Sequence, residues 1–163
     1  MRPTERLLDI TDALDEAGIP FLVMGGHAVR HYGLERLTVD FDFHLSLSAA
    51  TAVAEKLRQT RLFCSALLRE EAIWCGEDFR RFQIGVLPSG KEEWLEFWFR
   101  NHLLAPFEEL YARREEGWVL RRSVSFLSLP DLIRSKETQR DDDWQDSRVP
   151  GRVPRRAASA RRN

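Results

Sequence analysis

The chain has 163 residues, of which 43% are hydrophobic, and a formal net charge of −1. This composition suits one domain with a packed core and excludes a largely disordered chain. No apolar run approaches the ~20 residues that a membrane-spanning helix needs, and the N-terminus is too polar for a secretory signal. We therefore expect a cytoplasmic protein with no membrane partner.

The charges are unevenly distributed along the chain. Residues 1–147 hold 19 Lys and Arg against 26 Asp and Glu, whereas residues 148–163 hold six Arg and no acid. The last segment has no apolar periodicity, so we expect a domain over 1–147 and a disordered Arg-rich tail over 148–163. The helical pattern that starts at Lys136 stops after Asp146. A non-native or frameshifted gene end is one explanation of this change.

Hydrophobic periodicity and turn residues divide the domain into helices and strands. In chain order, the sequence predicts helix 4–17 (N-cap Thr4, end at Gly18), strand 20–24, helix 26–32 (end at Gly33), strand 37–47, helix 49–59 (cap Ser48), strands 61–69, 79–87 and 93–100, helix 105–115, strand 118–126 and a helix capped by Ser128. Pro88-Ser89-Gly90 marks a turn between two of the strands. The order predicts an α+β fold in which helices flank a small mixed sheet.

Two acids stand out in the predicted strand 37–47. Asp40 and Asp42 are two residues apart, so on a strand they share one face, with Cα atoms about 6.6 Å apart. Alternating apolar residues occupy the other face. Adjacent carboxylates are costly without a neutralising partner, which favours a divalent cation between them. The alternative is that both acids mark the solvent face of an edge strand.

The residues before these acids complete a longer pattern. It reads Gly25-Gly26-His27-Ala28, a short helix, and then Arg36-Leu37-Thr38-Val39-Asp40-Phe41-Asp42. This pattern resembles the nucleotidyltransferase superfamily with the DNA polymerase β-like fold, and within it the AbiEii-like and minimal nucleotidyltransferases of bacteria. The resemblance covers roughly residues 5–146.

The resemblance implies transfer of a nucleoside monophosphate from an NTP to a hydroxyl of an RNA or protein acceptor. It also implies Mg²⁺ or Mn²⁺ as the cofactor. The resemblance further implies a role in a toxin–antitoxin or phage-defence system, with a cognate toxin or antitoxin as partner.

The third carboxylate of the family comes from a neighbouring strand, and Glu96 is the candidate here. It lies in strand 93–100, on the face opposite Leu95 and Phe97. The family more often has Asp at this point, and an ordinary solvent-facing role for Glu96 stays open. On the catalytic interpretation, Asp40, Asp42 and Glu96 are both the catalytic residues and the metal ligands.

The resemblance also implies a nucleotide-binding set. Its members are Gly25, Gly26, His27, Arg36, Thr38 and Lys136. The glycines would let the backbone approach a triphosphate. His27 would bond a phosphate or cap the helix, and Arg36 would bind the triphosphate or form an ion pair with a nearby acid. Lys136 would contact the nucleotide or lie on a solvated helix face.

Two alternatives to catalysis remain at this point. The first is an inactive nucleotide- or partner-binding module on the same fold. The second is a structural metal site in an unrelated fold, which the strand placement of the aspartates disfavours. His44 shares the face of the acids, as a supporting group or a plain polar residue. Trp94 and Trp98 either stack on a base or pack in the core.

Overall fold

The computed structural model of the chain describes residues 2–34, 38, 40–63, 69–72, 79–101 and 103–136. The helical elements are α1 (Pro3–Glu16), α2 (Gly25–His31), η1 (Leu47–Ala49, a 3₁₀ turn), α3 (Val53–Arg58), α4 (Phe107–Ala112) and a helix over 129–136. The strands are β1 (Phe21–Met24), β2 (Phe41–Leu45), β3 (Arg69–Ala72), β4 (Phe79–Val86), β5 (Glu92–Trp98), β6 (Glu115–Val119) and β7 (Arg122–Phe126). None of the helices within these ranges is long and apolar enough to cross a membrane.

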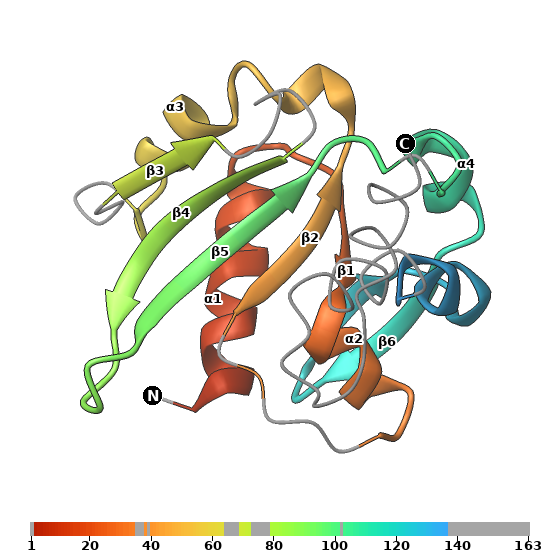
Figure 1. The fold of residues 1–163 in the computed structure, drawn as a ribbon, viewed down its shortest axis with the longest axis horizontal. Coiled ribbons are helices and arrows are strands. Elements are labelled where there is room, and N and C mark those ends of the chain that lie inside the picture. Colours follow the sequence, from red (N-terminus) through yellow and green to blue (C-terminus); the bar gives the residue numbers. More distant parts are fainter. Residues whose placement is uncertain are drawn as a thin grey trace, which may run out of the picture.

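The strands form a single mixed sheet in the order β3-β4-β5-β2-β1-β7-β6 (Figure 1). The pairs β2/β5 and β1/β7 are parallel, and the other neighbouring pairs are antiparallel. The expected α+β fold with a mixed sheet flanked by helices is therefore confirmed. The parallel pairing of β2 with β5 matters most for function, because it joins the two acidic strands.

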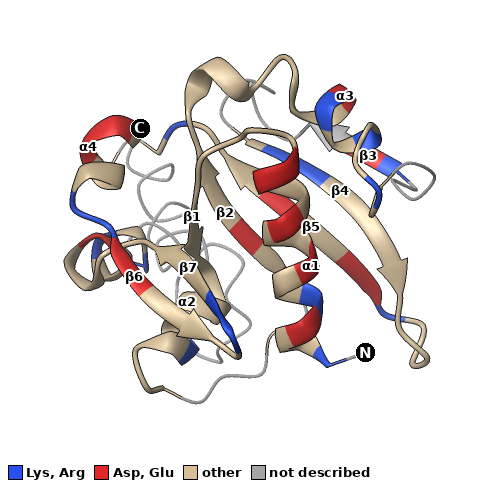
Figure 2. Cartoon of the chain, turned by 180° about the vertical axis from the view of Figure 1, so that it is seen from behind, with Lys and Arg blue, Asp and Glu red and all other residues tan. Residues whose placement is uncertain are grey.

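The core lies between the sheet and α1, which crosses β2, β5 and β4 on one face in both overall views (Figures 1 and 2). Ile10 and Leu14 of α1 are fully buried there with Phe43 and Phe97 of the central strands. Each such side chain stabilises the fold by about 1.5–3 kcal/mol. Because strand side chains alternate, this apolar face sends the polar residues of β2 and β5 to the opposite face.

Several local predictions are confirmed. β1 is completely buried, as a short apolar strand should be. Gly18 follows α1 with a φ of +70°, and Gly33 follows α2 with a φ of +95°, both in the left-handed region that suits glycine at a helix end. The Ser128 hydroxyl accepts a hydrogen bond from the Asp131 backbone N–H at 3.4 Å, as a helix cap does.

Two predicted helix caps are wrong. The cap of α1 is Arg2, and Pro3 takes the first helical turn, so Thr4 lies inside the helix. The predicted helix 49–59 is split. Ser46, and not Ser48, caps η1 through its side chain, and α3 begins only at Val53. Proline at the first turn needs no donor of its own, which explains the earlier start of α1.

Three strand predictions also need correction. The strand predicted over 61–69 is a turn at 61–63, and β3 begins at Arg69. The single strand predicted over 118–126 is the hairpin β6–β7, with Leu120 at a φ of +53° in the turn. β2 is shorter than predicted, because Asp40 lies in a bend just before it. The predicted helix 105–115 is the shorter α4.

Candidate active site

The site centres on two carboxylates that the sheet places side by side. Asp42 of β2 and Glu96 of β5 are directly paired in the parallel register. Strand neighbours lie about 4.8 Å apart, and both side chains emerge on the face away from α1. Figure 2 shows the acidic positions on these two neighbouring strands. The sequence therefore predicted correctly that Glu96 faces away from the core next to the acidic strand.

Burial and the neighbouring acids hold a proton on Glu96. Desolvation is the first cause, followed by the charge of Asp42 and a hydrogen bond from the Glu96 carboxyl to Asp42, and together they raise the pKa of Glu96 to about 9. The charge of Asp40 raises it further, which places Asp40 within electrostatic reach of the pair. The pKa of Asp40 itself is also raised by burial. Three carboxyl groups lie close enough to disfavour one another's ionised forms, and a bound cation would relieve this repulsion.

Gly25 makes room for the Asp42 carboxylate. Its φ of +64° lies in the left-handed region, and a Cβ atom built on it would lie 2.8 Å from Asp42 Cβ and Cγ and would overlap Oδ2. A side chain at this position would therefore meet both backbone strain and a direct clash. The first glycine of the pair packs against a catalytic candidate of the same chain.

Gly26 plays the same role for Thr38. A Cβ atom on Gly26 would come within 2.7 Å of Thr38 Cβ and Oγ1. The Thr38 hydroxyl in turn donates a hydrogen bond to the backbone carbonyl of Asp40 at 3.1 Å. The close packing of Gly26 on Thr38 and the hydrogen bond from Thr38 to Asp40 together fix the bend that carries Asp40. The structure brings together Gly25, Gly26, Thr38 and the acids, as the motif predicted.

Arg81 joins the cluster from β4, and the sequence analysis missed it. It is the antiparallel partner of Glu96, and its charge lowers the pKa values of both Glu96 and Asp40. Its guanidinium lies 3.5 Å from the ring centroid of Trp94, a cation–π contact that holds it on the acidic face. An arginine in this position can neutralise carboxylates or phosphate.

Trp94 and Trp98 flank Glu96 along β5. The Trp94 side chain is buried and donates a hydrogen bond to Glu92 at 3.2 Å, whereas Trp98 packs against Phe79 with ring centroids 4.4 Å apart. Trp94 therefore has packing partners of its own and also supports Arg81. Stacking of either ring on a base stays a prediction.

His27 lies apart from the acids. Its ring stacks on Phe41 with centroids 4.8 Å apart, and Phe41 alternates with Asp42, so the ring is on the opposite face of β2. Burial, and then the charge of Arg30, lower the pKa of His27 to about 4. The cap of α2 is Met24, so the expectation that His27 caps this helix is wrong. Phosphate binding by His27 stays a prediction.

The remaining predicted residues are placed only in part. Arg36 lies outside the described residues, as does the tail over 148–163. Lys136 is half-buried at the last described position of helix 129–136. Its contact with a nucleotide therefore stays a prediction, as does the division of the chain at residue 147.

The chemistry of the acids fits a hard divalent cation, since Mg²⁺ and Mn²⁺ prefer carboxylate oxygens. As the side chains stand, no three His, Cys, Asp or Glu residues among those described converge as a ready set of ligands. Asp42 and Glu96 meet through a proton, with Asp40 nearby. A metal would replace that proton as the neutralising partner.

The molecule is similar to the lincosamide antibiotic adenylyltransferase LnuA bound to lincomycin, with a TM-score of 0.56 and 13% identity over 79% of this chain and 82% of that chain. It is also similar to the antibiotic-resistance factor ANT(2'')-Ia, with a TM-score of 0.55 and 20% identity over 99% of this chain and 83% of that chain. The chain has the nucleotidyltransferase fold.

A third structure with the nucleotidyltransferase fold is an antigenic nucleotidyltransferase-like protein from Paracoccidioides brasiliensis. Its TM-score is 0.51, with 16% identity over 98% of this chain and 72% of that chain. No family model matches the sequence, and no curated protein matches it. At such low identities the likeness establishes the nucleotidyltransferase fold alone, and the AbiEii-like branch stays a prediction.

Proposed function

We propose that this protein is a metal-dependent nucleotidyltransferase that moves a nucleoside monophosphate from an NTP to a hydroxyl group. The observation that carries the proposal is the pairing of Asp42 with Glu96 directly beside the Gly25 turn. A half-buried carboxylate pair that holds a proton costs free energy, so stability alone explains it poorly. It is well explained as a site that a cation and a triphosphate complete.

In the proposed reaction the acceptor oxygen forms a bond to the α-phosphorus. The bond from that phosphorus to the bridging oxygen breaks, and pyrophosphate leaves with the electron pair. Asp40 and Asp42 would hold the metal, which would displace the proton of Glu96. Glu96 would then either take the proton of the attacking hydroxyl or join the ligands, in which case that proton would pass to solvent water. When bound, Mg²⁺ or Mn²⁺ would neutralise these carboxylates and polarise the phosphate.

The other residues of the site have positioning roles in this proposal. Arg81 and the predicted Arg36 and Lys136 balance the charge of the triphosphate. The turn at Gly25 and Gly26 fixes Asp42 and Thr38, and through Thr38 the bend that carries Asp40. With an NTP as the substrate, a cytoplasmic location is part of the proposal, because NTPs are abundant there.

The resemblance of the motif supports a further part of the proposal. It points to an RNA or protein acceptor and to a toxin–antitoxin or phage-defence role with a cognate partner. Co-expression with neighbouring genes and a growth assay would test this role. Growth unaffected by expression of the wild-type protein, under conditions where it is active, would count against it.

One observation favours a second candidate, an inactive nucleotide- or partner-binding module. The described acids do not form a set of three convergent ligands. A protein of this kind would bind NTP or a partner and release no pyrophosphate. The two candidates therefore differ in turnover and not in binding.

Calorimetric titration of NTP into the purified protein with Mg²⁺ tests both candidates, with the Asp40→Asn/Asp42→Asn variant as control. Under the proposal, binding requires Mg²⁺ and disappears in the variant, and pyrophosphate is released once an acceptor is supplied. Binding without release supports the inactive module. Unchanged transfer by the double variant would sink the proposed mechanism.

A further inference from the structure

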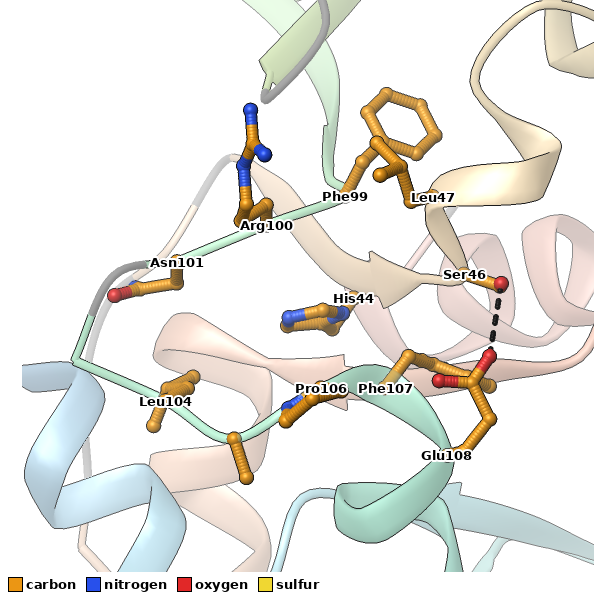
Figure 3. Close-up of a pocket in the computed structure, with 11 residues that line it drawn as sticks. His44, Ser46, Leu47, Phe99, Arg100, Asn101, Leu104, Pro106, Phe107 and Glu108 are labelled. Carbon is orange, nitrogen blue, oxygen red and sulfur yellow. Dashed lines mark hydrogen bonds between the residues drawn. The ribbon is translucent and has the colours of Figure 1, made fainter.

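A pocket lies at the end of β2, two residues beyond Asp42. Its volume is about 400 Å³, within the range of small-molecule sites. The lining comes from the ends of β2 and β5 and from the segment leading into α4, and it is largely apolar, with Phe99, Leu104 and Phe107 among its members. Figure 3 shows the hydrogen bond of 3.2 Å from Ser46 to Glu108 that joins two sides of the rim.

The polar centre of this pocket is His44. Its ring is 1% exposed and points from β2 into the space between Asn101 and Leu104 (Figure 3). Nδ1 lies 3.0 Å from the Leu45 carbonyl oxygen. A carbonyl only accepts, so Nδ1 carries the hydrogen and donates it, and Nε2 of the neutral ring is left as an acceptor.

Nε2 of His44 has no hydrogen-bond partner in the part of the chain that the structure describes. A buried polar atom without a partner costs free energy, and such atoms are rare in folded proteins. The neighbouring Asn101 does not satisfy it, since its Oδ1 is an acceptor that binds the Leu103 backbone N–H at 3.1 Å, and no donor among the described residues bonds His44 Nε2. The pocket thus contains an unpaired acceptor, His44 Nε2, to which a bound molecule could donate a hydrogen bond.

We propose that this pocket binds a small organic molecule with an apolar body and a hydroxyl group that donates a hydrogen bond to His44 Nε2. Since Asp42 and His44 share one face of β2, with Cα atoms about 6.6 Å apart, the molecule lies beside the acids. We further propose that this bound molecule, and not RNA or protein, accepts the nucleoside monophosphate, a role that rests on the proposed function. The attacking group is then a further hydroxyl of the same molecule, in the transfer step given above.

Binding is tested first, without nucleotide or metal, with two probes that differ only in the donor. 2-Naphthol has the hydroxyl, and 2-methoxynaphthalene replaces it with an ether that cannot donate. A ligand of this size has an expected Kd on the order of 1 mM. We expect 2-naphthol to move the His44 ring-nitrogen resonance in NMR spectra and the ether to bind about tenfold more weakly.

Variants locate the binding. His44→Leu removes the acceptor, and we expect about tenfold weaker binding of 2-naphthol. Ala105→Phe fills the pocket from a partly exposed position and leaves His44 in place, so it should abolish binding even if His44→Leu folds poorly. The matched control is His27→Leu, a second buried histidine with an orphaned Nε2 that lines a separate cavity of about 190 Å³. Equal binding of the two probes, or no effect of Ala105→Phe, would overturn the proposal.

The acceptor role is tested with labelled NTP, Mg²⁺ and a panel of small polyhydroxylated compounds against RNA and protein. Transfer to a small compound that Ala105→Phe suppresses supports the role. Transfer to RNA or protein that Ala105→Phe leaves unchanged overturns it, while the proposed function stands. The absence of pyrophosphate release with every acceptor would instead refute the proposed function and leave the binding result intact.

Discussion

The Asp42 carboxylate fills the space that a side chain at Gly25 would need. Gly25 opens α2 directly after β1, and β1 pairs with β2 so that Met24 lies opposite Asp42. The glycine turn therefore holds a catalytic candidate in place, in addition to the phosphate contact that its sequence predicts. This arrangement makes the glycine sensitive to substitution for two separate reasons.

Gly25→Ala should be more damaging than the same change at Gly18. Both have a left-handed φ, of +64° and +70°, but no atom lies within 4 Å of a Cβ at Gly18. The conformation alone costs about 1–2 kcal/mol, or roughly 2–8 °C in Tm for a chain of this size. The clash with Asp42 adds about 1–3 kcal/mol. Thermal unfolding and NTP titration measure the effect. Equal decreases in Tm for Gly25→Ala and Gly18→Ala would show that the Asp42 side chain can move aside without cost.

Glu96→Gln should stabilise the protein in the absence of metal, increasingly so at high pH. The carboxyl has a pKa of about 9 in the folded state against an ordinary value of 4.5, so the folded state binds more protons than the unfolded state between these two pH values. Wild-type stability therefore falls as pH rises through this window, by at most about 1.4 kcal/mol per pH unit from this group.

Unfolding in EDTA from pH 5 to 9 measures this effect. The difference in Tm between Glu96→Gln and the wild type should grow with pH, and Mg²⁺ should reduce it by stabilising only the wild type. Glu55→Gln, which removes an exposed carboxylate of α3, is the control. A difference that stays constant with pH would contradict the raised pKa.

Arg81→Met should weaken NTP binding far more than Arg80→Met. Arg81 lies on the acidic face, where its charge lowers the pKa values of Glu96 and Asp40. Arg80 instead forms an ion pair with Glu70 at 3.2 Å. Loss of a charge-assisted contact costs about 1.5–3 kcal/mol, which is about 10- to 150-fold in Kd. Calorimetry with Mg²⁺ checks the ratio. Similar affinities of the two variants would remove Arg81 from the site.

His27→Phe should reduce the loss of folding free energy that occurs as the pH falls below 6.5. Burial lowers the pKa of His27 from 6.5 to about 4, so its contribution is complete above pH 6.5 and is lost as pH falls toward 4. Phenylalanine keeps the stacking on Phe41 and cannot take up the proton. Denaturant unfolding at several pH values measures the slope. An acid slope that is unchanged in His27→Phe would contradict the lowered pKa of His27.

The sequence contained the local part of the site. An apolar strand, a Gly-Gly turn and an alternating acidic strand are determined by residues within 25 positions of one another. The structure has β1, α2 and β2 in the predicted order, although β2 begins only at Phe41. The alternation in β5 also placed Glu96 on the correct face, because Leu95 and Phe97 have to be buried.

The parts that depend on register were not predictable. A turn centred on Ser89 sets the pairing of Val86 with Glu92, and continued regularly it would place Phe82 opposite Glu96. A bulge between Gln83 and Gly85 shifts the register by one residue and brings Arg81 there instead. The turn at Leu120 lacks the usual glycine or asparagine, so the hairpin β6–β7 gave no signal.

The pairing of Asp42 with Glu96 also has a consequence for how the chain folds. The two residues are 54 positions apart, on units that each form through local contacts, the segment from β1 to β2 and the hairpin β4–β5. We expect their union to be a late docking step, because parallel pairing of distant strands is intrinsically slow. Since the acids would approach each other only then, their repulsion would oppose this step, and the rate of folding should depend on proton and cation concentration.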